Sequence, residues 1–197
     1  YTASSSDLKN QKSGSDIYIM NADGSHAKAL TEDGKSSSAV WSKDGKSIFF
    51  TNYEKGTAQI FRMDLTTCET EQVTDYELGI GSPVISPDER YIAFTAEVYP
   101  DLGADAKANK ARMEKKEQGP VQAHIADKLL YRHWTSYNDG RCNHLILFDT
   151  QTKTYKDLTP GNYSLIFVVG GGITYQFSPD SKEICFVSNH DEHQEAS

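Results

Sequence analysis

Two short sequence patterns recur in this 197-residue chain, and their regular spacing constrains its fold more than any other feature. The first pattern is a strand, a turn led by Ser and a second strand, and it covers residues 40–51, 85–95 and 177–188. In such a turn Ser can bond the backbone, Pro sets φ at the second place and Asp suits the third, as in Pro87–Asp88 and Pro179–Asp180. We therefore expect a hairpin in each segment.

The fourth place of the turn differs among the copies. Gly45 fills it in the first copy, whereas Glu89 and Ser181 fill it in the other two. Because a type I turn does not require Gly at this place, we expect all three hairpins to form.

The second pattern is an alternating apolar strand, a turn led by Asn or Asp, and a strand that ends on Thr. It covers residues 17–31, 60–74 and 145–159. The turn residue precedes the Thr by ten positions in every copy: Asn21 and Thr31, Asp64 and Thr74, Asp149 and Thr159. A fixed offset in three copies indicates one repeated structural unit.

The period of the repeat identifies the architecture. Ser42 and Ser86 are 44 residues apart, and each unit offers four short strands. Repeats of about 40–45 residues with four strands are typical of β-propeller blades. A β-sandwich would also show short alternating strands, but not the same turn at the same phase of a four-strand period. The sequence predicts an all-β fold, a fragment of a β-propeller.

One blade carries a long insertion. Ser86 and Ser178 are 92 residues apart, and most of the excess over one period falls in residues 96–143. Residues 103–118 have a helix-forming composition, with Asp101 as a candidate N-cap and Gly119–Pro120 as the stop. We expect a helix-containing insertion between the second and third strands of this blade.

The repeats divide the chain into one partial propeller domain, 1–197. We expect a half blade over 1–31, a blade over 38–75, a blade over 82–159 with the insertion 96–143, a half blade over 173–188 and a polar tail over 189–197. Propellers close with four to eight blades, so these belong to a larger propeller. Open sheet edges can pair with other chains, so we expect the isolated chain to self-associate.

Composition excludes several classes of function. A net charge of -8 argues against nucleic-acid binding, which needs a basic surface. The longest apolar run has five residues, Leu165–Val169, so no membrane span is expected, and no signal peptide is visible. The three cysteines form no CxxC motif, which disfavours a zinc or dithiol site, and Cys185 is expected to be a small buried hydrophobe. No cofactor is predicted.

Several other residue groups could be taken for a catalytic or metal site, but the sequence favours a structural interpretation of each. Gly170–Gly172 lacks the GxSxG pattern of a nucleophile elbow and is interpreted as a joint between blades. His190 and His193 are interpreted as a solvated loop rather than a metal site. Trp41 is expected to pack in the core or between blades, and His26 to be exposed in a turn.

Residues 131–141 contain the densest group of candidate functional side chains: Arg132, His133, Trp134, Tyr137 and Asp139. Asn138–Gly140 is a strong turn signal, so one hypothesis is a hairpin in which Arg132, His133 and Trp134 support the insertion. The other hypothesis is that these side chains face a propeller channel and contact a peptide. The residues alone leave both open.

Residues 98–149 resemble the propeller insertion of prolyl oligopeptidase-family serine peptidases, in the branch of dipeptidyl peptidase V and acylaminoacyl-peptidase. The resemblance rests on Pro100–Asp101, Arg132–Trp134, Asp139–Gly140 and His144–Leu145, and residues 158–180 resemble the segment that follows. The Ser-led turns are shared with TolB-like propellers. In Thr135 and Tyr137 the chain departs from the pattern, which has Asp and Trp there.

The resemblance implies a parent enzyme with a propeller and a C-terminal α/β-hydrolase domain that carries the catalytic Ser, Asp and His. This chain would be the non-catalytic propeller, restricting access of peptide substrates in a periplasmic or secreted exopeptidase that releases dipeptides or acylated residues. It would itself hold no catalytic residue, because the hydrolase domain lies beyond residue 197. The alternative is a TolB-like propeller that serves as a non-enzymatic interaction module in the cell envelope.

Overall fold

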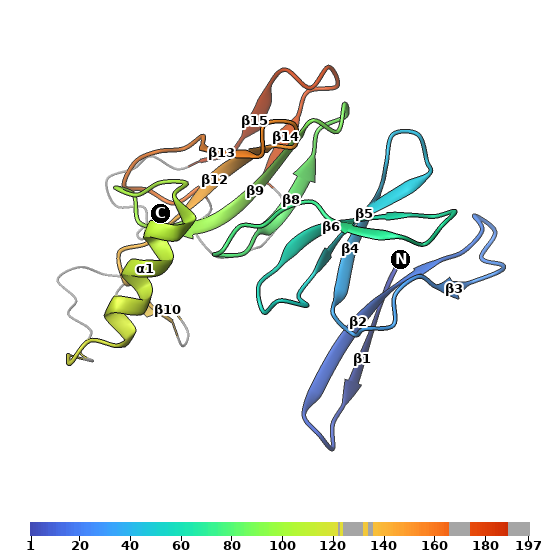
Figure 1. Ribbon diagram of the computed structural model, residues 1–197, viewed down its shortest axis with the longest axis horizontal. Helices are drawn as coiled ribbons and strands as arrows, with labels where there is room; N and C mark the ends of the chain where they lie inside the picture. Colours follow the sequence, from blue (N-terminus) through green and yellow to red (C-terminus); the bar gives the residue numbers. More distant parts are fainter. Residues whose placement is uncertain (122, 124–131, 134–135, 166–173, 189–197) are drawn as a thin grey trace. The chain divides into compact units, whose positions relative to one another are not determined.

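A computed structural model describes residues 1–121, 123, 132–133, 136–165 and 174–188 (Figure 1). The chain forms two compact units, Tyr1–Ile80 and Gly81–Ser197. Every paired strand in both units is antiparallel, and the described helix is short. No helix within the described residues is long and apolar enough to cross a membrane.

The first unit contains two sheets. One has the order β1–β2–β3, built from Thr2–Asp7, Lys12–Ile19 and Lys28–Ala29. The other has the order β4–β5–β6–β7, built from Ser36–Trp41, Ser47–Asn52, Gln59–Asp64 and Thr70–Gln72. The core of the unit joins Ile17 of the first sheet to Ile48, Phe50 and Met63 of the second. The two sheets therefore pack on each other through apolar faces, as neighbouring blades do.

The second unit repeats this plan. Its four-stranded sheet has the order β8–β9–β12–β13, built from Gly81–Ile85, Tyr91–Val98, Cys142–Asp149 and Thr154–Asp157. A two-stranded sheet, β14 (Tyr175–Phe177) and β15 (Ile184–Phe186), packs on it through a core of Ala93, Leu145, Leu165, Tyr175 and Phe177. The prediction of four-stranded propeller blades is confirmed.

The insertion lies where the sequence predicted it, between β9 and β12. It contains helix α1 (Ala106–Glu117) and a small hairpin sheet of β10 (Arg132–His133) and β11 (Ser136–Tyr137) (Figure 1). The predicted N-cap was wrong. Asp105, not Asp101, caps the helix, because its carboxylate accepts the Ala108 N–H at 2.9 Å.

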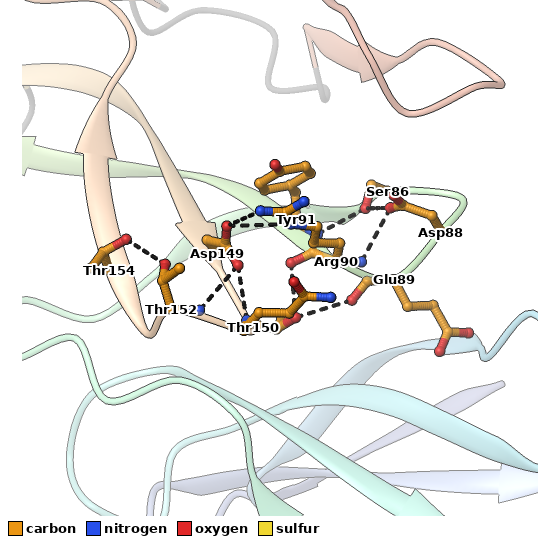
Figure 2. A network of polar contacts seen from close by, with 10 residues as sticks. Ser86, Asp88, Glu89, Arg90, Tyr91, Asp149, Thr150, Thr152 and Thr154 are labelled. Carbon is orange, nitrogen blue, oxygen red and sulfur yellow. Dashed lines mark hydrogen bonds and ion pairs between the residues drawn. The ribbon is translucent and has the colours of Figure 1, made fainter.

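The Ser-led turns have the same hydrogen bonds in all three copies, and Figure 2 shows the second one. The Ser86 hydroxyl donates to Asp88 Oδ1 at 2.6 Å and accepts the Tyr91 N–H at 2.9 Å. Asp88 Oδ1 also accepts the Arg90 N–H, and these donors hold the pKa of the Asp88 carboxyl below its usual range. Asp44 and Asp180 make the matching bonds, so the three aspartates are turn formers, as predicted.

A second turn is tied to this one. Arg90 pairs with Asp149 of the β12–β13 turn at 3.0 Å, and the Thr150 hydroxyl donates to the Arg90 carbonyl at 2.8 Å (Figure 2). Asp149 in turn accepts the N–H groups of Gln151 and Thr152, as a turn-leading Asp should. The two patterns found in the sequence thus meet at one end of this blade.

The fourth place of the Ser-led turn adopts a left-handed conformation in every copy. Its φ is 69° at Gly45, 62° at Glu89 and 63° at Ser181. All three hairpins form, as predicted, but left-handed backbone is costly for a residue with a Cβ, so Gly suits this place of the turn better than Glu or Ser.

We expect Glu89→Gly to raise the free energy of unfolding by about 0.5–1 kcal/mol, because relief of the left-handed strain exceeds the added entropy of the unfolded chain. Urea unfolding of the two proteins measures the difference. Glu32→Gly, at an exposed position without positive φ, is the control and should lower stability instead. A loss of stability in Glu89→Gly would contradict the strain argument.

Three further predictions about single elements were wrong in whole or in part. The first sheet has an additional strand, β1, where two strands over 17–31 were expected. Trp41 is 60% exposed and does not lie in the core of its unit, whereas its packing between blades stays a prediction. Cys185 is exposed rather than buried. His26 is exposed, as predicted, whereas Gly170–Gly172, His190 and His193 lie outside the described residues.

Candidate functional site

The fold brings only some of the predicted candidates in residues 131–141 close to one another. Arg132 and Tyr137 face each other across the β10–β11 pair, with the guanidinium 6.0 Å from the centre of the Tyr137 ring. Both residues are exposed. His133 lies opposite Ser136 in the same pair, whereas Trp134 lies outside the described residues.

The predicted hairpin across Asn138–Gly140 was wrong. The hairpin pairs β10 with β11, whereas β12 pairs with β9 and β13. Asn138–Gly140 is instead a turn that leads from β11 into β12, with Gly140 at φ 89° and its N–H bonded to Asn138 Oδ1. The turn signal was correct, but the strands that it connects are not neighbours in one sheet.

This turn fastens the end of the insertion to helix α1 and to strand β9. Lys116 Nζ of the helix donates to the Asp139 carbonyl at 2.8 Å. Arg141 pairs with Asp139 at 2.9 Å and with Glu97 of β9 at 3.1 Å, and its Nη1 lies 3.8 Å from the sulfur of Met113. These contacts tie the end of the insertion to β9 and α1 through Asp139, one of the five predicted candidates, and through Arg141, which was not among them.

Cation–π contacts and an ion pair also hold the start of the insertion against helix α1. The cations of Arg112 and Lys116 lie 4.7 and 4.9 Å from the centre of the Tyr99 ring, which is buried just after β9. Arg112 also makes two hydrogen bonds of 2.7 Å to the Asp101 carboxylate. The Arg112 guanidinium holds the pKa of that carboxyl below its usual range.

One buried amide sets the distance between helix and strand. Asn109 is 0% exposed, and its Oδ1 accepts the Tyr99 N–H at 2.6 Å. Its Nδ2 donates to the carbonyls of Gly103 and Asp105 at 3.0 and 2.8 Å. Asn109 thus uses donors and acceptor together to fix the loop between β9 and α1.

A buried ion pair lies beneath this loop. His144 of β12 is 0% exposed, and its Nδ1 lies 2.7 Å from Asp157 Oδ2 of β13. Its Nε2 lies 3.0 Å from the Gly161 carbonyl. Burial opposes protonation of the ring, but the bond to Asp157, together with Cys142 and Gly161, outweighs it and raises the pKa of His144 to about 9.

We call Tyr99, Asn109, Arg141 and His144, with their partners, the insertion root. Apart from the Tyr99 hydroxyl, which is buried without a hydrogen-bond partner, the polar groups described above bond one another or the backbone, as is typical of a structural support. Among the described residues, no group of three or more His, Cys, Asp or Glu is placed to hold a metal ion. Among the exposed side chains of the insertion, Arg132 and Tyr137 lie next to each other and offer a cation and an aromatic ring for contacts with a polar ligand.

We expect Arg141→Ala to lower the free energy of unfolding by about 1 kcal/mol, because partly exposed ion pairs contribute little. The difference should shrink in about 1 M NaCl, where charge interactions are screened. Urea unfolding at low and high salt measures both effects. Glu97→Gln, which removes one of the two ion pairs, should cost less than half as much; equal salt-independent losses would contradict this account.

The chain belongs to the TolB beta propeller domain family, whose pattern matches residues 6–119. It is 28% identical over 193 residues to dipeptidyl-peptidase 5 of Porphyromonas gingivalis. The aligned region covers 95% of this chain and 27% of that protein. It is also 28% identical over 80 residues to the Tol-Pal system protein TolB of Francisella tularensis, across 40% of this chain and 18% of TolB. The chain thus spans about a quarter or less of the length of these relatives.

Solved structures show the same fold. The acylaminoacyl peptidase of Pyrococcus horikoshii matches 81% of this chain and 23% of its own, with a TM-score of 0.58 and 21% identity. An oligogalacturonate lyase matches 88% of this chain with a TM-score of 0.54 and 16% identity. The resemblance to dipeptidyl and acylaminoacyl peptidases inferred from residues 98–149 is therefore confirmed, and propellers of other proteins share the fold.

Proposed function

We propose that this chain is the non-catalytic, substrate-gating propeller of a serine exopeptidase that releases dipeptides or acylated residues from the N-termini of peptides. One observation carries the proposal: similarity to dipeptidyl-peptidase 5 extends over 95% of the chain, so it includes the insertion as well as the repeats. The repeats are common to many propellers, whereas the insertion is the distinctive part.

The insertion root supports a gating role. Tyr99, Asn109 and Arg141 hold the helix and the turn before β12 against the blade, so the β10–β11 pair lies in the chain between two fixed ends. On it Arg132 and Tyr137 are exposed, and these two, with His133, Trp134 and Asp139, are the residues we assign to the peptide route or its support. A fixed base lets such side chains discriminate among substrates by size and by terminal charge.

The proposal includes the rest of the protein. The catalytic Ser, Asp and His lie in an α/β-hydrolase domain outside residues 1–197, and the blade boundaries are those given by the repeats. Peptides are the substrates, and the parent enzyme acts in the periplasm or after secretion. The isolated chain self-associates through open sheet edges, which sedimentation of residues 1–197 would test.

The test uses the intact protein that carries this chain. A fluorophosphonate probe should label one Ser outside residues 1–197, and peptides with a free or acylated N-terminus should lose a dipeptide or an acylated residue. Arg132→Ala with Tyr137→Ala should change kcat/KM for long peptides more than for a dipeptide reporter. Labelling without N-terminal release would overturn the exopeptidase assignment.

A second candidate is a TolB-like interaction module without enzymatic activity. The match of the TolB beta propeller domain family to residues 6–119 favours it, because that match covers most of the repeats. An intact protein that takes up no probe but binds an envelope protein through this propeller would support this function and exclude the first.

A further inference from the structure

One position of the repeat anchors the connection that leaves each sheet. It lies 15 residues before the repeated Thr and is occupied by Asp16, Gln59 and His144. In the second copy, Gln59 Nε2 donates to the Tyr76 carbonyl at 2.7 Å, and Gln59 Oε1 accepts the Tyr76 N–H at 3.0 Å. Gln59 thereby fixes the chain two residues after Thr74.

The first copy does the same with a carboxylate. Asp16 Oδ1 accepts the Gly34 N–H at 3.0 Å and the Thr31 hydroxyl at 3.1 Å. The acceptor is a carboxyl oxygen here and an amide oxygen in Gln59, yet both hold the segment just after the outer strand. The anchoring role thus belongs to the position and not to one residue type.

In the third copy the anchor is His144, whose Nε2 bonds the carbonyl of Gly161, two residues after Thr159. Its Nδ1 bonds the carboxylate of Asp157. A carbonyl and a carboxylate only accept hydrogen bonds, so both ring nitrogens must carry protons for both bonds to exist. A neutral ring has one N–H and must lose one of the two bonds.

The carboxylate that pairs with His144 also lies close to the insertion, an element that the sheets of Asp16 and Gln59 lack. Gly103, at the start of the insertion, has φ 51°, and a Cβ on it would lie 3.2 Å from Asp157 Oδ2. The partner carboxylate of His144 is therefore in close contact with the loop that Asn109 fixes from the other side through the Gly103 carbonyl.

We propose that His144 is a protonation-dependent latch: its doubly protonated ring holds the 159–165 connection and the insertion root together, and loss of one proton releases the connection. This inference does not depend on the proposed peptidase function, since it concerns only contacts within the blade.

The groups around the ring fix the direction of the effect. Asp157 of β13 and Cys142 of β12 contact the ring, and the ring centre of Tyr163 lies 6.4 Å from that of His144. Asp157 is the carboxylic acid among these, so it is the group that can pair with an imidazolium ring. The pKa of His144 is raised from 6.5 to about 9, so the latch is fully closed below pH 6.5 and opens as pH rises through about 9.

Hydrogen exchange of the intact protein tests the latch at pH 6.5 and pH 9.5, after correction for intrinsic exchange. The reporter is the Leu165 N–H, which bonds the Asn143 carbonyl at 2.7 Å, in peptides covering 158–165. Its protection should fall by about 10- to 100-fold at the higher pH. Peptides covering 74–80, anchored by Gln59, are the internal control and should not respond.

His144→Gln keeps a donor for Gly161, as Gln59 does for Tyr76, and should abolish the pH response. His26→Gln, at an exposed histidine, should leave the wild-type response intact. An equal pH response in His144→Gln, or in the 74–80 peptides, would overturn the proposal. If His144→Gln does not fold, the comparison of 158–165 with 74–80 in the wild-type protein still decides it.

Discussion

Asp157→Asn should lower the free energy of unfolding at pH 6 by about 3 kcal/mol, the free energy that corresponds to a rise in the pKa of His144 from 6.5 to about 9. The amide retains an oxygen for the Thr159 N–H, which Asp157 Oδ1 accepts at 2.9 Å, but it carries no charge to balance the buried imidazolium. Breaking a buried pair by removing one partner is costly because the remaining ion is left uncompensated. Urea unfolding at pH 6 measures the loss.

The stabilisation by the His144–Asp157 pair depends on pH, and the direction of this dependence follows from the shift in the pKa of His144. A raised pKa means that the folded protein holds its proton more tightly than the unfolded chain does, so stability from the pair is complete below pH 6.5 and disappears above pH 9. The difference between wild type and Asp157→Asn should therefore shrink as pH rises through this range. Asp101→Asn, which breaks the exposed pair with Arg112, is the control; its smaller effect should not change over that range.

The repeated elements could be predicted because their determinants are local. The Ser and Asp side chains of the turns bond backbone groups within five residues, as at Ser42 and Asp44. The offset that ends on Thr has a reason that the structure supplies: the Thr74 hydroxyl accepts the Ile60 N–H at 2.9 Å, and Thr31 and Thr159 make the same bond. Because the same residue type makes the same hydrogen bond in all three copies, Thr recurs at a fixed offset in the sequence.

The insertion root could not be predicted, because its partners are far apart and occur once. Asn109 lies in a polar helix, where an Asn is ordinarily exposed; it is buried only because the loop after β9 passes beside it. Arg141 draws its partners from β9 and from the adjacent turn, which no periodicity links. The dense group of His, Trp and Tyr in residues 131–137 is the stronger signal in the sequence, although the anchoring residues Asp139 and Arg141 follow it.

A signal for His144 was present in the sequence. Alignment of the repeats on their Thr residues places it with Asp16 and Gln59, a position that is polar in all copies. A polar residue at the start of an apolar strand, repeated three times, indicates a hydrogen-bonding role. Burial was harder to infer: Trp41 and Cys185 have apolar neighbours in their strands, yet both are exposed, because packing across sheets decides burial.

Asn109→Ala should lower the free energy of unfolding by about 2–4 kcal/mol, since it removes the acceptor of the buried Tyr99 N–H and the side-chain donor of the Gly103 carbonyl, whereas the Asp105 carbonyl keeps the backbone N–H of residue 109. Hydrogen exchange should quicken in residues 99–118 while β4–β7 keep their protection, because the lost bonds lie only at the insertion root. Asn138→Ala removes an exposed amide that accepts one N–H and is the matched control, with an expected loss below about 1 kcal/mol. A uniform loss of protection across both units would show that Asn109 stabilises the whole chain and not the root of the insertion.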